Sequence, residues 1–163
     1  MLASGAEDVE EDVNGLLLEA SNDIDFADGF IVGLRYEVCI PRGASILNAT
    51  LTVTADEADT LATSATIWAE RGFNAAPFSD ELPSERTRTM STVPWSDIPA
   101  WDIGTVETSP DLSALLNEAL SDDENRERCG HIVLIIEGTG DREAVSFDND
   151  PALAPRLEFT YQP

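Results

Sequence analysis

The sequence predicts an all-β protein: a jelly-roll-type antiparallel β-sandwich covered by one α-helix. Three observations indicate this fold. Most segments alternate apolar and polar residues with a period of two, Gly, Pro and Asp separate these segments, and one stretch has the apolar spacing of a helix. The 163 residues suffice for one sizeable core. We therefore expect a single β-sandwich domain over residues 1–163.

Four segments carry the strand pattern most clearly. Residues 30–41 are expected to bury one face, formed by Val32, Leu34, Tyr36, Val38 and Ile40. In residues 45–55 the inward positions are predicted to be Leu47, Ala49, Leu51 and Val53. Residues 63–71 should point Ala65, Ile67 and Ala69 inward and Thr66, Trp68 and Glu70 outward. Residues 131–138 are apolar on both faces, which is typical of a covered central strand.

The helix is predicted over residues 110–121, with Ser109 as its N-cap and Pro110 at its first position. Its apolar stripe, which we expect to cover the sandwich, consists of Leu112, Leu115, Leu116, Ala119 and Leu120. Residues 71–101 are predicted to be one long irregular loop, anchored to the core by Trp95 and Trp101.

The charge of the chain restricts its partners. There are 32 acidic residues against 9 basic ones, all of them Arg, and the formal net charge is -23. Such a surface repels phosphate backbones, so we expect no nucleic-acid partner. Two interpretations stay open: a halophilic protein adapted to high salt, or an acidic secreted surface. No apolar run approaches the roughly 20 residues that span a bilayer, so no membrane insertion is expected, and the N-terminus shows no signal-peptide pattern.

Little in the sequence suggests catalysis. His131 is the single histidine, which leaves few ways to build a nucleophilic or His-based metal site, and acids are too abundant for any one pair to indicate a glycosidase. Cys39 and Cys129 lack metal-ligand spacing and are either one disulfide or two separate buried thiols. Asn48 begins an N-glycosylation sequon, Asn-Ala-Thr.

The order of motifs resembles a known family. The acidic "EDVEED" is followed by "SNDIDF", by "VGLRYEVCIPRGASILNATLTV" and, near the end, by "SFDNDPALAPRLEFTY". From about residue 5 to 161 the chain resembles secreted β-sandwich modules of the DNRLRE type, which are similar to carbohydrate-binding modules. The resemblance implies a non-catalytic module of a larger extracellular protein. Such a module binds a glycan or cell-surface polysaccharide, or serves as a structural or adhesion building block that contacts neighbouring modules.

The resemblance also suggests site residues. In such modules the N-terminal strand lies beside the C-terminal one, so acids from both ends approach each other, and Ca²⁺ takes roughly six to eight oxygen ligands. The implied ligands of a structural Ca²⁺ are Asp8, Glu10, Glu11, Asp23, Asp25 and Asp148. A solvated acidic strand is the alternative.

Three residues depart from the family pattern. Trp68 stands on a polar strand face where the family has a polar residue, and it is the candidate for stacking against a sugar. Its alternative is burial under the loop of residues 71–101. Cys39 and Cys129 replace small polar residues, and because a secreted chain with two cysteines usually pairs them, we predict a disulfide.

Overall fold

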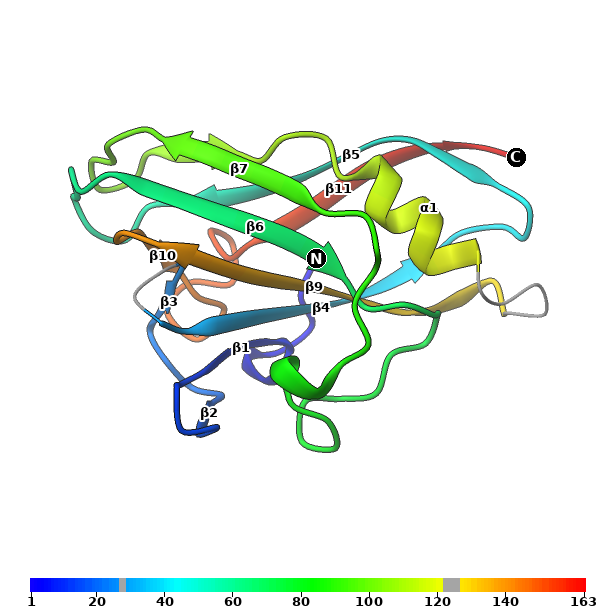
Figure 1. The fold of residues 1–163 in the computed structure, drawn as a ribbon, viewed down its shortest axis with the longest axis horizontal. Coiled ribbons are helices and arrows are strands. Elements are labelled where there is room, and N and C mark those ends of the chain that lie inside the picture. Colours follow the sequence, from blue (N-terminus) through cyan, green and yellow to red (C-terminus); the bar gives the residue numbers. More distant parts are fainter. Residues whose placement is uncertain (27–28, 122–126) are drawn as a thin grey trace.

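The computed structural model describes residues 1–26, 29–121 and 127–163, and its strands form two facing layers (Figure 1). In the described part of the chain, the large sheet has the order β2-β1-β4-β9-β6-β7, with all pairs antiparallel. Its strands are β1 (Asp8–Glu11), β2 (Leu17–Leu18), β4 (Ile31–Cys39), β6 (Thr63–Ala69), β7 (Val93–Ile98) and β9 (Cys129–Thr139).

The second layer, which we call the small sheet, is built on β5. Strands β11 and β8 flank β5, and β10 with its partner β3 continues the β11 side through a bridge between Ala55 and Ala144. Its strands are β3 (Asp23–Asp25), β5 (Ser45–Thr54), β8 (Val106–Thr108), β10 (Glu143–Val145) and β11 (Arg156–Gln162). From β4 to β6 and from β7 to β10 the chain repeatedly crosses between layers, as a jelly roll does.

The core lies between the two layers and confirms the predicted sandwich. Val32, Leu34 and Tyr36 of β4 face Leu51 and Val53 of β5, and all five side chains are buried. On the outward face of β9, Val133 and Ile135 are also buried, as expected for a central strand.

Strand β5 departs from the predicted alternation at its start. Leu47 was expected inward but is 58% exposed, whereas Ile46 is buried. The cause is a register shift in the pairing with β11, between Thr160 and Tyr161, which offsets the pleat by one residue. From Ala49 onward the predicted inward positions are correct.

The helix is shorter than predicted. Within the described residues it is the only α-helix, and α1 runs from Ser113 to Ser121 rather than from residue 110. Residues 109–112 instead hydrogen-bond to the backbone of β5, next to the part of β5 that pairs with β8. The Ser109 hydroxyl accepts the N–H of Leu51 at 2.9 Å, and Asp111 Oδ1 accepts those of Ala49 and Ser113. The predicted N-cap Ser109 therefore binds the backbone of the small sheet and does not cap the helix. The apolar stripe of α1 is buried as expected.

The segment 71–101 is more ordered than predicted. It contains a 3₁₀ helix, η2 (Pro83–Glu85), and strand β7, which pairs with β6. Trp95 and Trp101 are buried against the core, where both rings meet Phe26 edge-on. The prediction of one long loop was wrong, but that of two anchoring tryptophans is confirmed.

The N-terminal strand is not where the family resemblance implied. β1 follows a short 3₁₀ helix, η1 (Gly5–Glu7), and lies between β2 and β4 of the large sheet, whereas β11 pairs with β5 in the small sheet. The expectation that β1 lies beside the C-terminal strand was therefore wrong.

Residues 71–86 cover part of the outer face of the large sheet. Phe78 packs above Gly33 of β4, where an added Cβ would come within 2.6 Å of the ring. A second apolar cluster forms where Ala75 and Phe78 of this cover pack against Val9, Val133 and Ile135 of the sheet. The cover leaves open the face of β6, β7 and the end of β9.

Candidate functional site

The open part of the large sheet's outer face is hollowed into a groove of about 390 Å³. Its floor comes from the outward residues of three neighbouring strands, which the period of two directs away from the core. The groove is lined by Ser64, Ala65, Thr66, Trp68, Pro94, Ser96, Glu137, Gly138 and Thr139. Hydroxyl groups therefore predominate among its polar groups, with one aromatic ring and one carboxylate.

Trp68 lies at the boundary between the covered and the open parts of this face. Its side chain is half-buried and packs against the second apolar cluster, near its strand partner Ile135. The remainder of the ring borders the groove. The outward orientation predicted for Trp68 is confirmed, and the structure places it between the two alternatives, partly under the covering segment and partly accessible.

Arg88, which sequence reasoning missed, completes this corner. Its guanidinium carbon lies 4.7 Å from the centre of the Trp68 ring, a cation–π distance, and Nη2 forms an ion pair with Glu137 Oε1. The Arg88 and Glu137 side chains keep 24% and 38% of their surface exposed. The three side chains form one unit, which we call the Trp68–Arg88–Glu137 corner.

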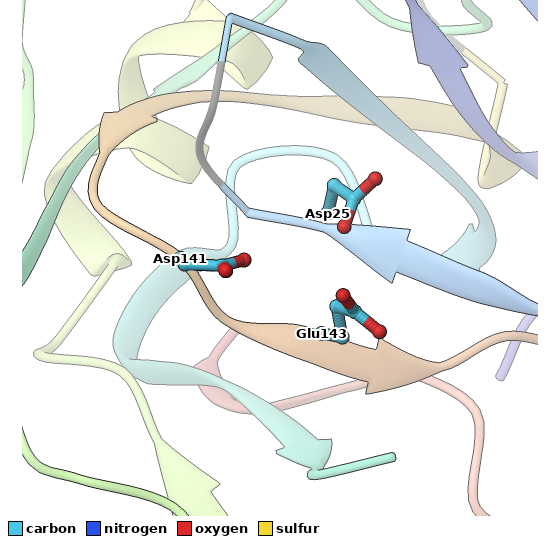
Figure 2. Close-up of side chains that lie close together, drawn as sticks. All are labelled: Asp25, Asp141 and Glu143. Carbon is cyan, nitrogen blue, oxygen red and sulfur yellow. The ribbon is translucent and has the colours of Figure 1, made fainter. Parts of the chain in front are cut away.

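A second candidate site lies at the junction of β3 and β10. Asp25 from β3, Glu143 from β10 and Asp141 from the segment leading into β10 offer carboxylate oxygens within 4.8 Å of one another (Figure 2). The direct pairing of Asp25 with Glu143 in the antiparallel register places these two side chains on the same face. Three hard oxygen ligands of this kind suit Ca²⁺ better than a transition metal.

Burial and neighbouring acids disfavour the charged form of Glu143 at this junction. Burial raises the pKa of Glu143 to about 7, and repulsion from Glu57, Asp25, Asp23 and Asp141 adds to the shift. The adjacent Arg142 is engaged with other groups. Its buried guanidinium donates to the carbonyl oxygens of Ile98 and Pro99 and pairs with Asp59.

Three acids of "EDVEED" accept hydrogen bonds from three separate segments, and a fourth, Glu7, forms an ion pair with Arg35. Asp8 Oδ2 accepts the N–H of Phe147 at 2.7 Å, and Glu10 Oε1 accepts that of Asp25 at 2.6 Å. Glu11 accepts both the N–H and the hydroxyl of Ser84. All three carboxylates are buried, so the stretch is neither a solvated tail nor a single convergent cluster.

Burial changes the pKa of two of these acids. It raises the pKa of Asp8 and of Glu10 to about 7, and charge repulsion from Asp148 and from Asp25, respectively, adds to it. Asp148 does lie near Asp8, but it belongs to the segment between β10 and β11 and not to the C-terminal strand β11. Asp23 accepts the hydroxyl of Ser21 at 2.7 Å. Of the six predicted calcium ligands, only Asp25 belongs to the three-carboxylate group at the β3–β10 junction.

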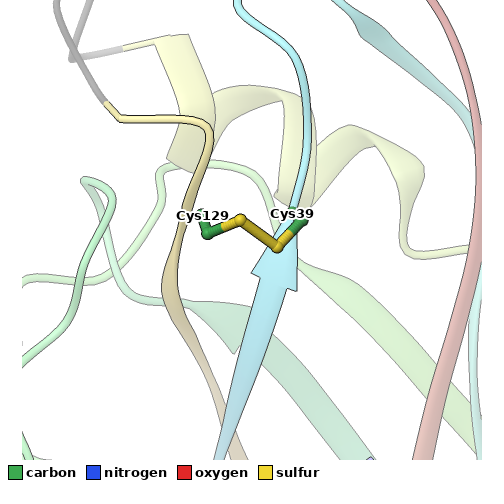
Figure 3. The surroundings of a disulfide bond; sticks show 2 residues. All are labelled: Cys39 and Cys129. Carbon is green, nitrogen blue, oxygen red and sulfur yellow. A yellow bond between two sulfur atoms is a disulfide. The ribbon is translucent and has the colours of Figure 1, made fainter.

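Cys39 and Cys129 form a disulfide, with the two residues directly opposite in the β4–β9 register and 4.0 Å between their Cα atoms (Figure 3). Both lie at exposed positions at the end of the large sheet. A disulfide is compatible with an extracellular protein.

Asn48, the sequon residue, is also exposed, on β5 opposite Thr160. His131 lies on β9 with Nδ1 3.4 Å from Asn74 Oδ1. Among the described residues no helix has the length and apolar character needed to cross a membrane.

Comparison of the chain with protein-family models and with curated proteins finds no match. The interpretation of both sites therefore depends on their geometry.

Proposed function

We propose that this protein is a non-catalytic extracellular module that binds a polysaccharide in the groove on the large sheet, and that Ca²⁺ at the β3–β10 junction stabilises it. The groove is the observation that carries the proposal. It is open and shallow, its polar lining consists mainly of hydroxyl groups, and hydroxyl-rich ligands are bound by side chains of this kind. The disulfide is consistent with an extracellular setting.

The calcium part of the proposal rests on charge compensation. Asp25, Asp141 and Glu143 gather carboxylates with more acids around them, and a divalent cation would neutralise that repulsion. The ion would then join β3 to β10, and so hold together two strands that are distant in the sequence.

Affinity gel electrophoresis against a panel of soluble polysaccharides tests the binding function. We expect at least one polymer to retard the protein. Thr139→Arg should weaken that retardation at least tenfold, because an arginine at this exposed position fills the groove without entering the core. Thr160→Arg is the matched control, on an exposed strand position of the small sheet. Equal retardation of both variants would refute binding in the groove.

A specific observation favours a second function, that of a structural or adhesion building block. A hollow of about 200 Å³ on the small sheet is bordered by exposed apolar residues, with Met1 80%, Val106 62% and Leu153 43% exposed. Apolar surface of this kind suits contact with another protein. Under this alternative, Val106→Asp would reduce association between neighbouring modules, and Thr139→Arg would leave it unchanged.

A further inference from the structure

The charged groups at the groove are already paired with each other. Glu137 is the charged residue among those that line it, and its carboxylate is bound by Arg88. The Trp68–Arg88–Glu137 corner therefore contributes hydrogen-bond donors from Arg88 and acceptors from Glu137, and its net charge is small. A ligand carrying its own charge would have to compete with one member of this pair.

The net charge of the whole surface determines which charged ligands would bind unfavourably. The chain carries a formal net charge of -23, so a polyanion approaching any face meets repulsion. A uronate that displaced Glu137 from Arg88 would also leave two carboxylates beside one guanidinium. A polycation would be attracted to the whole surface, but such attraction is weakened by salt and is not specific to the groove.

The groups that remain for recognition suit hydroxyls. Ser64, Thr66, Ser96 and Thr139 each carry a hydroxyl that can donate and accept. Ser64 Oγ already accepts the N–H of Asp97 at 3.1 Å, which leaves its O–H to donate. An uncharged sugar, with donor and acceptor on every hydroxyl, matches these groups without a desolvated charge.

Arg88 is preorganised to take part in this recognition. Its guanidinium is fixed on one side by the Trp68 ring at 4.7 Å and on another by Glu137, yet the side chain is partly exposed. A guanidinium has about five N–H donors in a rigid plane, and the ion pair engages Nη2. The ring supports the guanidinium, and the guanidinium lies over the face that a sugar would otherwise contact.

We propose that the groove binds an uncharged, hydroxyl-rich polysaccharide and that Arg88, held by Trp68 and Glu137, is the side chain that binds its hydroxyl groups. This inference rests on the proposed polysaccharide-binding function. In it, Trp68 acts mainly as the support of Arg88, and the guanidinium donates hydrogen bonds to neighbouring sugar hydroxyls.

The test is affinity gel electrophoresis at 0.05 and 0.5 M NaCl with three kinds of polymer. The uncharged probes are hydroxyethylcellulose, galactomannan and arabinoxylan, the polyanion is alginate, and the polycation is glycol chitosan. We expect retardation by at least one uncharged polymer at both salt concentrations and none by alginate. Arg88→Lys, which keeps the charge but loses the planar donors, should weaken retardation at least tenfold. Arg156→Lys, on exposed β11, should not.

The possible failures are distinguishable. Retardation by alginate, or by glycol chitosan alone, overturns the inference. If Thr139→Arg weakens that retardation, the charged polymer binds in the groove and the proposed function stands. Unchanged binding by Arg88→Lys overturns the role of Arg88. Retardation by none of the polymers overturns both the inference and the proposed function. Thermal unfolding of each variant shows whether a loss of binding reflects a loss of fold.

Discussion

Calcium should raise the stability of this protein, and the increase should depend on Glu143 and on pH. Asp25, Asp141 and Glu143 place carboxylate oxygens within 4.8 Å of one another. A ligand that binds only the folded state at about 100 times its dissociation constant adds about 2.7 kcal/mol to the free energy of unfolding. For a domain of this size that corresponds to roughly 5–10 °C in melting temperature.

The pKa of Glu143 sets the pH dependence. Because burial and neighbouring acids raise it to about 7, Glu143 must lose a proton before it can bind the cation. At pH 6 the apparent dissociation constant should be about tenfold higher than at pH 8. The same Ca²⁺ concentration would then add only about 1.4 kcal/mol.

Differential scanning calorimetry at fixed ionic strength measures both quantities, first in chelator and then in millimolar Ca²⁺, at pH 6 and pH 8. Glu143→Gln should remove the calcium-dependent increase, whereas Glu158→Gln, an exposed acid on β11, should keep it. Asp8→Asn tests the ligands that the family resemblance implied.

Two results would refute the reasoning. A melting temperature unchanged by Ca²⁺ at pH 8 would leave the three carboxylates as an unoccupied acidic group. Loss of the calcium response in Asp8→Asn but not in Glu143→Gln would place the ion at the N-terminal strand instead of the β3–β10 junction.

Four further predictions concern stability. In chelator, the melting temperature should rise between 0.01 M and 1 M NaCl, because salt screens repulsion within a net charge of -23; a flat or falling curve would contradict this. Replacing Cys39 and Cys129 by serine should cost about 4–5 kcal/mol in guanidinium unfolding, since the bond closes a loop of 90 residues, and a cost below 1 kcal/mol would be inconsistent with the loop-entropy model. Asp8 has a pKa raised to about 7, so the folded state holds its proton more tightly and stability should fall by about 2.3 kcal/mol from pH 5 to pH 7; Asp8→Asn should flatten this slope in pH-dependent denaturation, and an unchanged slope would exclude Asp8 as its source. Gly33→Ala should cost about 1–3 kcal/mol, measured by urea unfolding, because the new Cβ would come within 2.6 Å of the Phe78 ring, and a neutral effect would show that the ring moves freely.

The fold was predictable where one face of a strand is buried without interruption. The alternation in β4 and β6 identified their inward residues correctly, and the apolar run of β9 identified a central strand. The prediction failed at Leu47, because a register shift against β11 is a property of the pair of strands and leaves no mark on β5 alone. Strand β7 was missed because Pro94 and the positive φ of 52° at Asp97 break its pattern.

The candidate sites were predictable only in part. Alternation placed Trp68 on the outer face, but Arg88 reaches it from a segment with no periodic pattern. Asp25 was identified as an acidic candidate, whereas Asp141 and Glu143 were not. Their proximity follows from the pairing of β3 with β10, two short strands far apart in the sequence, and neither strand has enough residues to indicate its partner.

The Cys39–Cys129 bond also determines how far the chain can be extended when it is pulled from its ends. The bridge joins residues 90 positions apart, so the chain between them cannot add to the end-to-end extension of the protein while the bond is intact. At about 3.5 Å per extended residue, the bond withholds roughly 300 Å of contour length. Under tension the oxidised protein would therefore extend only its two terminal segments. Trp68 and Arg88 lie inside the closed loop, whereas Glu137 lies in the C-terminal segment, so extension of that segment would separate the members of the Trp68–Arg88–Glu137 corner.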